Sequence, residues 1–260
     1  MSPLRIFPVL AALLLTSAAC AQTSATTPAP DAPAPMTERD LTKALTAETQ
    51  AAMTPRQVIQ LLKDGNQRFL DGTPLERNFM AQVRETSEGQ FPMAAILGCI
   101  DSRVPHEIVF DKGVGDVFSA RVAGNFVNTD ILGSLEFATA AAGAKVIVVL
   151  GHTSCGAVKG ACDGVELGNL TSTLANISPA IYRVGDSIEG EQSSSNKAYV
   201  EAVAHANVEL TVRNMVERSR VLYELVESGD LIIVGAMHDV ASGRVEFYED
   251  SMLTAETLDG

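Results

Sequence analysis

Short apolar runs alternate with longer segments of helical periodicity along most of the chain. Four runs have the length of buried strands: Met93–Leu97, Val117–Val122, Val146–Leu150 and Leu231–Val234. Between them lie helical patterns, chiefly Ile131–Ala142 and Tyr199–Glu227. This alternation predicts a single α/β domain with a mostly parallel central β-sheet flanked by helices. The alternating segment Arg244–Tyr248 is expected to add an edge strand.

A helix is also predicted ahead of the first strand. Thr54 followed by Pro55 is typical of an N-cap and first helical position, and apolar residues then recur at helical spacing up to Phe69. The weaker amphipathic stretch Leu41–Met53 precedes this helix. We expect that stretch to form an N-terminal helical arm.

The first 35 residues differ from the rest. A basic start, a short apolar stretch and small residues predict an export signal over residues 1–21, because a membrane span needs about 20 apolar residues. Two cleavages fit the sequence, one before Gln22 and one before Cys20, which would become lipidated as in a lipoprotein; a buried N-terminal helix is the alternative. Residues 22–35, rich in Pro, Ala and Thr, predict an extended tether. The folded domain is then expected at 36–260, in the periplasm or cell envelope.

Charge and composition exclude some functions. The formal net charge of −13 argues against a nucleic-acid surface, because such a surface needs clustered Lys and Arg. Hydrophobic residues make up 46% of the sequence, which is enough for a sizeable core. The acidity therefore indicates a solvated surface and no nucleic-acid partner. Contact with a membrane is expected only through a lipid on Cys20.

Reactive side chains follow two of the predicted strands. Cys99, Asp101 and Arg103 come directly after one, and His152 and Cys155 after another. Ligands of open parallel sheets bind beyond the carboxyl ends of the strands. Two thiolates and one imidazole suit zinc and leave a fourth position open, which is typical of a catalytic site.

Several alternatives remain at this point. Asp101 could be a fourth metal ligand, or Arg103 could hold its carboxylate in an ion pair. Cys99 and Cys155 could instead form a disulfide in an oxidising compartment, although that gives no reason for the neighbouring His, Asp and Arg. The remaining candidates are given ordinary structural roles. The other three histidines are interpreted as surface residues or as core residues with hydrogen-bond partners: His106, His205 and His238. Cys162 is interpreted as a small buried residue.

Two separated motifs carry a resemblance to a known family. C-x-D-S-R at 99–103 and G-H-x-x-C-G at 151–156 occur with Gln90, Ala-Gly-Asn at 123–125 and G-A-x-x-D-V-x-x-G at 235–243. Over roughly residues 54–248 the chain resembles β-class carbonic anhydrases, as a bacterial, exported member. The resemblance implies a Rossmann-like fold and one Zn²⁺ per chain. It also implies a homodimer or dimer of dimers, with active sites at the dimer interface and the N-terminal arm embracing the partner.

The implied reaction is the reversible hydration of carbon dioxide to bicarbonate and a proton by a hydroxide formed on zinc. Asp101 and Arg103 would be the catalytic pair, and Asp101 would ligate the metal when released from Arg103. The resemblance also assigns a substrate-binding set: Gln90, Phe118, Phe137 and Gly156. Hydrolysis of carbonyl sulfide or carbon disulfide on the same zinc is the alternative reaction. A non-catalytic envelope protein is a weaker alternative, because none of the five motif residues has been lost.

Overall fold

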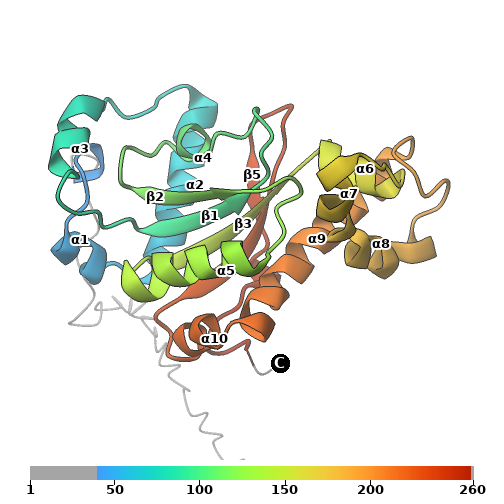
Figure 1. The fold of residues 1–260 in the computed structure, drawn as a ribbon. Helices are drawn as coiled ribbons and strands as arrows, with labels where there is room; N and C mark the ends of the chain where they lie inside the picture. Colours follow the sequence, from blue (N-terminus) through green and yellow to red (C-terminus); the bar gives the residue numbers. More distant parts are fainter. Residues whose placement is uncertain (1–39, 259–260) are drawn as a thin grey trace, which may run out of the picture. The chain divides into compact units, whose positions relative to one another are not determined.

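In the part of the chain that the structure describes, five strands form one sheet in the order β2-β1-β3-β4-β5 (Figure 1). Their bounds are β1 Ala94–Gly98, β2 Val117–Arg121, β3 Val146–His152, β4 Ile232–His238 and β5 Val245–Phe247. The first four strands are parallel, and β5 runs antiparallel to β4 at the edge. The mostly parallel sheet predicted from the sequence is therefore confirmed, together with its late edge strand.

The structure is a computed structural model that describes residues 40–258. These residues lie within one compact unit, Pro35–Gly260. The predicted signal at 1–21, the tether at 22–35 and the start of the domain at Met36 lie outside the described residues. None of the helices in the described range is long and apolar enough to cross a membrane.

Helices occupy most of the chain between the strands. The α-helices are α1 Ala47–Ala52, α2 Pro55–Asp71, α3 Phe79–Glu85, α4 His106–Val109, α5 Thr129–Glu136, α6 Gly156–Cys162, α7 Gly168–Ala175, α8 Ser178–Val184, α9 Lys197–Arg218 and α10 Arg220–Glu227. Shorter turns of other helix types are η1 Asp40–Thr42, η2 Phe137–Ala141, η3 Gly185–Ser187 and η4 Glu249–Ser251.

The start of α2 is where the sequence predicts it. The Thr54 hydroxyl accepts a hydrogen bond from the backbone amide of Gln57, and the Gln57 side chain accepts one from the backbone amide of Thr54. Pro55 occupies the first helical position. The helix ends at Gly72, whose φ of 66° suits glycine. Within the predicted N-terminal arm the structure has only the short η1 and α1.

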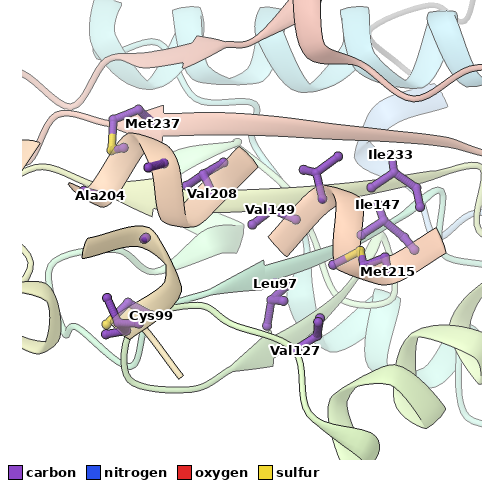
Figure 2. Close-up of a cluster of buried hydrophobic side chains, with 14 of the residues drawn as sticks. Leu97, Cys99, Val127, Ile147, Val149, Ala204, Val208, Met215, Ile233 and Met237 are labelled. Atoms are coloured by element: carbon purple, nitrogen blue, oxygen red, sulfur yellow. The ribbon is translucent and has the colours of Figure 1, made fainter. Parts of the chain in front are cut away.

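Side chains that alternate along the strands belong to two hydrophobic cores, one on each face of the sheet. Leu97, Val149 and Ile233 point to the face covered by α9, where Figure 2 shows them facing Val208 and Met215. The residues between them in sequence point to the opposite face, which α2 and α4 cover. Both faces of β1, β3 and β4 are thus buried, as their continuous apolar runs require, whereas the edge strand β2 is partly exposed.

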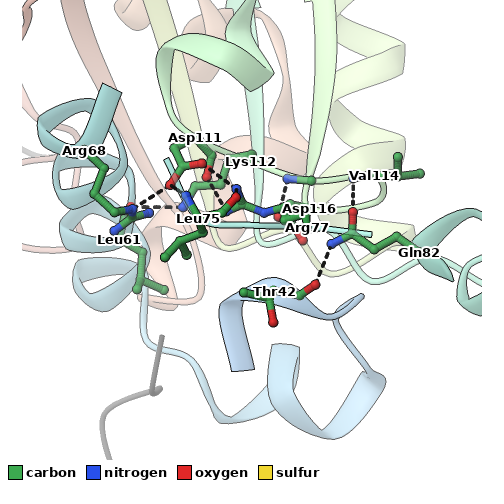
Figure 3. A network of polar contacts seen from close by, with 11 residues as sticks. Thr42, Leu61, Arg68, Leu75, Arg77, Gln82, Asp111, Lys112, Val114 and Asp116 are labelled. Carbon is green, nitrogen blue, oxygen red and sulfur yellow. Dashed lines mark hydrogen bonds and ion pairs between the residues drawn. The ribbon is translucent and has the colours of Figure 1, made fainter. Parts of the chain in front are cut away.

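A buried polar network connects the segments on the α2 side of the sheet (Figure 3). The Asp111 carboxylate accepts bonds from Arg68 of α2 and from Arg77 in the loop before α3. The Gln82 side chain donates to the carbonyl of Thr42. Because Asp111 is only 5% exposed, losing one arginine would leave a buried charge less compensated. The network therefore fixes the N-terminal segments against the loop that leads into β2.

Two predicted helices are divided in the structure. The segment predicted at Tyr199–Glu227 forms α9 and α10, which meet at Ser219. The buried Ser219 hydroxyl accepts the amide of Leu222, and so begins a new helix. The segment predicted at Ile131–Ala142 changes from an α-helix to a π-helix at Phe137. Both segments are therefore helical as predicted, but each contains a boundary that the pattern does not mark.

Candidate metal centre

Cys99, His152 and Cys155 converge at the carboxyl ends of β1 and β3. Their ligand atoms all lie within 4.8 Å of one another, and the three residues are buried. Cys99 directly follows β1, His152 is the last residue of β3, and Cys155 is the N-cap of α6. The chain turns between His152 and Cys155 through Ser154, whose φ of 55° is unusual for a non-glycine residue. The three residues predicted as zinc ligands are therefore brought together.

The His152 ring is oriented for a metal. Its Nδ1 lies 3.0 Å from the carbonyl oxygen of Thr153, which can only accept, so Nδ1 carries the proton. The lone pair is then on Nε2, which is buried and has no hydrogen-bond partner. Metal-binding histidines commonly donate their other ring nitrogen to a carbonyl in this way. An unpartnered buried nitrogen beside two thiols fits a thiophilic cation such as Zn²⁺.

The two thiols are free and lie next to each other. Their sulfur atoms are 4.0 Å apart, roughly twice the S–S bond length of about 2.05 Å, so the disulfide alternative does not describe this structure. A hydrogen bond from Cys155 lowers the pKa of the Cys99 thiol, and the backbone amide of Gly124 adds to the effect at 3.4 Å from the sulfur. The same contact with Cys99 raises the pKa of Cys155. One thiolate therefore forms readily, and a cation would stabilise the second.

Asp101 lies beside this group and is paired with Arg103. The arginine Nε donates to Oδ1 at 2.9 Å and its Nη2 to Oδ2 at 2.8 Å. These hydrogen bonds hold the pKa of Asp101 well below its usual range. Asp101 Oδ2 is 3.8 Å from His152 Nε2. The carboxylate is thus ionised and close, but it belongs to the ion pair and not to the three-residue group.

Arg121 is a residue that the sequence analysis missed. From the end of β2 its Nε donates to the carbonyl of Cys99 at 2.9 Å, and its Nη2 donates to the carbonyl of Asp101 at 2.5 Å. The guanidinium therefore fixes the backbone that carries the first motif. Its position directly before the Val-Ala-Gly-Asn segment gave no signal of this contact.

The predicted substrate residues are not gathered around the metal group within one chain. Phe118 pairs in register with Ala95, four residues before Cys99 and so about 13 Å from it along the strand direction. Gln90 is exposed and precedes β1, at the opposite end of the sheet. Phe137 contacts Phe118, with ring centroids 6.1 Å apart. Gly156 directly follows Cys155 and is exposed.

Phe118 and Phe137 line a surface groove of their own. Its volume is about 690 Å³, and it runs between the β2 edge and α5. Phe137 is 56% exposed there. The groove therefore presents aromatic surface away from the buried metal group of the same chain.

The histidines outside the motifs differ from one another. His205 is exposed and contacts the Tyr248 hydroxyl, as expected of a surface residue. His106 is buried and its Nδ1 meets Ser119 Oγ at 2.6 Å, and burial lowers its pKa to about 4. His238 was predicted to be a surface or satisfied core residue, which is wrong, because it is buried and neither ring nitrogen has a partner. Cys162 is half-buried, and burial raises its pKa to about 11.

Comparison with known proteins gives the class. A sequence profile of the carbonic anhydrase family matches residues 94–245. The chain is 37% identical over 187 residues to a carbonic anhydrase of Mycolicibacterium smegmatis, covering 71% of this chain and 89% of that protein. It is also 37% identical over 185 residues to carbonic anhydrase 2 of Mycobacterium tuberculosis, covering 70% and 87%.

Solved structures give the same answer for the fold. A tetrameric β-carbonic anhydrase of Sordaria macrospora superposes with a TM-score of 0.57 at 30% identity, covering 64% of this chain and 85% of that one. The β-carbonic anhydrase CafA of Aspergillus fumigatus gives 0.59 at 27% identity, with coverage of 68% and 84%. The chain belongs to the carbonic anhydrase family, in its β class. It catalyses the reversible hydration of carbon dioxide to bicarbonate.

Proposed function

We propose that Cys99, His152 and Cys155 hold one catalytic Zn²⁺ per chain and that Asp101 and Arg103 form the catalytic pair beside it. The observation that carries this proposal is the group of three buried ligand atoms within 4.8 Å of one another. The unpartnered Nε2 of His152 supports it, because a buried ring nitrogen without a partner is costly unless something binds it. Three protein ligands leave a coordination position for the reaction.

A Zn²⁺ held by these three residues would supply a nucleophile at neutral pH, because zinc lowers the pKa of water towards about 7. The Asp101 carboxylate would accept a hydrogen bond from the attacking water and so orient the oxygen lone pair towards the carbon of carbon dioxide. Arg103 keeps that carboxylate ionised and in one orientation, since it grips both oxygens. Release of Arg103 would free Asp101 to approach the metal as a fourth ligand.

A second copy of the chain completes the substrate pocket in this proposal. Gln90 and Phe118 lie towards the far end of the sheet from Cys99, so one chain cannot bring them to its own metal group. The β2 strand is at the sheet edge and offers unpaired backbone groups for a neighbour. The exposed Phe137 beside that edge would then lie, with Gln90 and Phe118, against the partner's site, where Gly156 is exposed. The tetrameric assembly named for the Sordaria macrospora protein is consistent with such contacts.

The protein is also proposed to be an exported bacterial enzyme of the periplasm or cell envelope. This rests on the signal-like residues 1–21 and the tether at 22–35. Cell fractionation tests it, with Cys20→Ser as the variant. A membrane-bound fraction that the variant releases would support a lipid anchor, whereas soluble enzyme in both cases would favour cleavage before Gln22.

Zinc analysis and stopped-flow hydration of carbon dioxide at pH 8.5 test the catalytic proposal. About one zinc per chain is expected, with fast hydration that Cys155→Ser abolishes because it removes one thiolate ligand. Zinc at full occupancy in the variant, with unchanged hydration, would refute the ligand assignment. Analytical ultracentrifugation of the same samples tests the dimer, which a strictly monomeric active enzyme would contradict.

A further inference from the structure

Asn207 is a buried polar side chain of α9 that reaches the back of the candidate metal centre. It is 3% exposed, and its Nδ2 donates to the carbonyl of Gly124 at 2.8 Å. The two residues are 83 positions apart in the sequence. Asn207 also borders a surface cleft of about 230 Å³. Asn214, further along α9, borders the same cleft.

Gly124 contacts Cys99 directly. Its amide N–H points at the sulfur, with the nitrogen 3.4 Å from Sγ. The backbone there has a φ of 86°, and a Cβ at this position would lie 2.6 Å from Ile177 Cδ1. Only glycine therefore suits both the conformation and the space.

The turn that carries this amide is unusual and needs support. Gly124 and Asn125 are consecutive residues with positive φ, 86° and 41°. A non-glycine residue in the left-handed region is strained and persists only where its surroundings fix it. Asn125 closes the turn by donating to the carbonyl of Val122 at 3.0 Å. The bond from Asn207 is the one that connects this turn to α9.

The helix that provides Asn207 is firmly placed. Ala206 and Val208 on either side of it are buried. Figure 2 shows α9 crossing the sheet, with Val208 and Ala204 packed in the same apolar cluster as Cys99. Asn207 is thus a polar donor from a rigid element, aimed at a strained turn.

We propose that Asn207 is a positioning residue for the metal centre: it fixes the turn that directs the Gly124 amide at the Cys99 sulfur. The inference rests on the proposed role of Cys99 as a zinc ligand. An N–H···S bond draws electron density from a thiolate, which makes the thiolate a weaker donor and the metal more electrophilic. Outer groups that hold metal ligands typically affect metal affinity or activity 10–100-fold.

Metal binding by the full-length protein tests this inference. Asn207→Leu removes the donor at similar volume, and Asn214→Leu is the control on the same helix and cleft. Zinc affinity is measured against a competing chelator. The sulfur-to-metal charge-transfer band is measured after cobalt substitution. We expect Asn207→Leu to move the band to longer wavelength, because a thiolate without its N–H···S bond is a stronger donor. We also expect it to lower zinc affinity about 10-fold or more, because the turn no longer holds Cys99 in place for the metal. Asn214→Leu should leave both unchanged.

Several results would overturn the inference. They are an unshifted band in Asn207→Leu, an equal effect of Asn214→Leu, or a loss of affinity without any spectral change, which would mark a purely structural role. If Asn207→Leu does not fold, Asn207→Ala provides the second test, because alanine suits a helix and removes the same donor. Failure of both to fold would also refute a positioning role. A wild-type protein without a charge-transfer band would instead refute Cys99 and Cys155 as ligands, so the two failures are distinguishable.

Discussion

Gly98 is the last residue of β1 and the residue immediately before Cys99, and it allows a sharp test of the packing beneath the metal centre. A Cβ built on Gly98 would lie 2.1 Å from Nε2 of His106. Ordinary contacts begin at 3.4 Å, so Gly98→Ala requires about 1.3 Å of displacement. His106 cannot easily move away, because it is fully buried and bonded to Ser119.

The cost of this substitution follows from overpacking. Extra volume in a tightly packed core typically costs about 1–3 kcal/mol in the free energy of unfolding. Part of the displacement should fall on β1 itself, which would shift Cys99 relative to His152. We therefore expect Gly98→Ala to lose both stability and zinc affinity, although alanine is a small residue.

A double-mutant cycle with His106→Ala isolates the cause. Urea unfolding gives the free energy of each variant, and zinc content is measured in parallel. Removing the imidazole should reduce the cost of Gly98→Ala, with a coupling of about 1 kcal/mol or more. The same cost of Gly98→Ala in both backgrounds would refute the steric explanation.

Three further predictions concern charge. Arg103→Ala should keep zinc but lower kcat about 100-fold, because Asp101 loses its fixed orientation; Arg103→Lys should recover part of it, and normal turnover in stopped-flow assays of Arg103→Ala would rule out the pair. Hydration activity should rise from pH 7 to above 8, because two thiolates cancel the zinc charge and leave its water less acidic; a flat pH profile down to pH 6 would contradict this. Burial opposes ionisation of Asp111, but its hydrogen bonds to Arg77 and Arg68 outweigh burial and lower its pKa. The contribution of Asp111 to the free energy of unfolding is therefore present above about pH 4 and is lost as pH falls through the folded-state pKa. Arg77→Ala should cost about 3–5 kcal/mol in urea unfolding at pH 7 and less at pH 3, and an equal cost at both values would disprove the pairing.

The strands were predictable because their environment is simple. Runs such as Val146–Leu150 are short, rich in β-branched residues and apolar at every position, which favours a strand buried on both faces. The start of α2 was predictable for a similar reason, since Thr54 and Pro55 act locally. In each case the sequence within a few residues determines the structure.

The helix boundaries depend on distant residues and were therefore missed. Nothing near Ser219 breaks the helical pattern, but its hydroxyl both caps α10 and donates to Glu136, 83 residues earlier in the chain. His238 is a comparable case. Its isolated position in the sequence suggested an ordinary core histidine, and only the pairing of β3 with β4 shows that it lies next to His152 in register.

The metal ligands and the substrate residues were predictable to different degrees for one geometric reason. In a parallel sheet the carboxyl ends of the strands lie on the same side. Cys99 and His152 could therefore be placed together from the strand pattern alone. By the same rule Gln90, which precedes β1, must lie at the opposite end of the strands, their amino end. A motif that contains both Gln90 and Cys99 therefore cannot describe one pocket in one chain. A second copy at the β2 edge removes the contradiction, so a dimer is part of the proposed site itself.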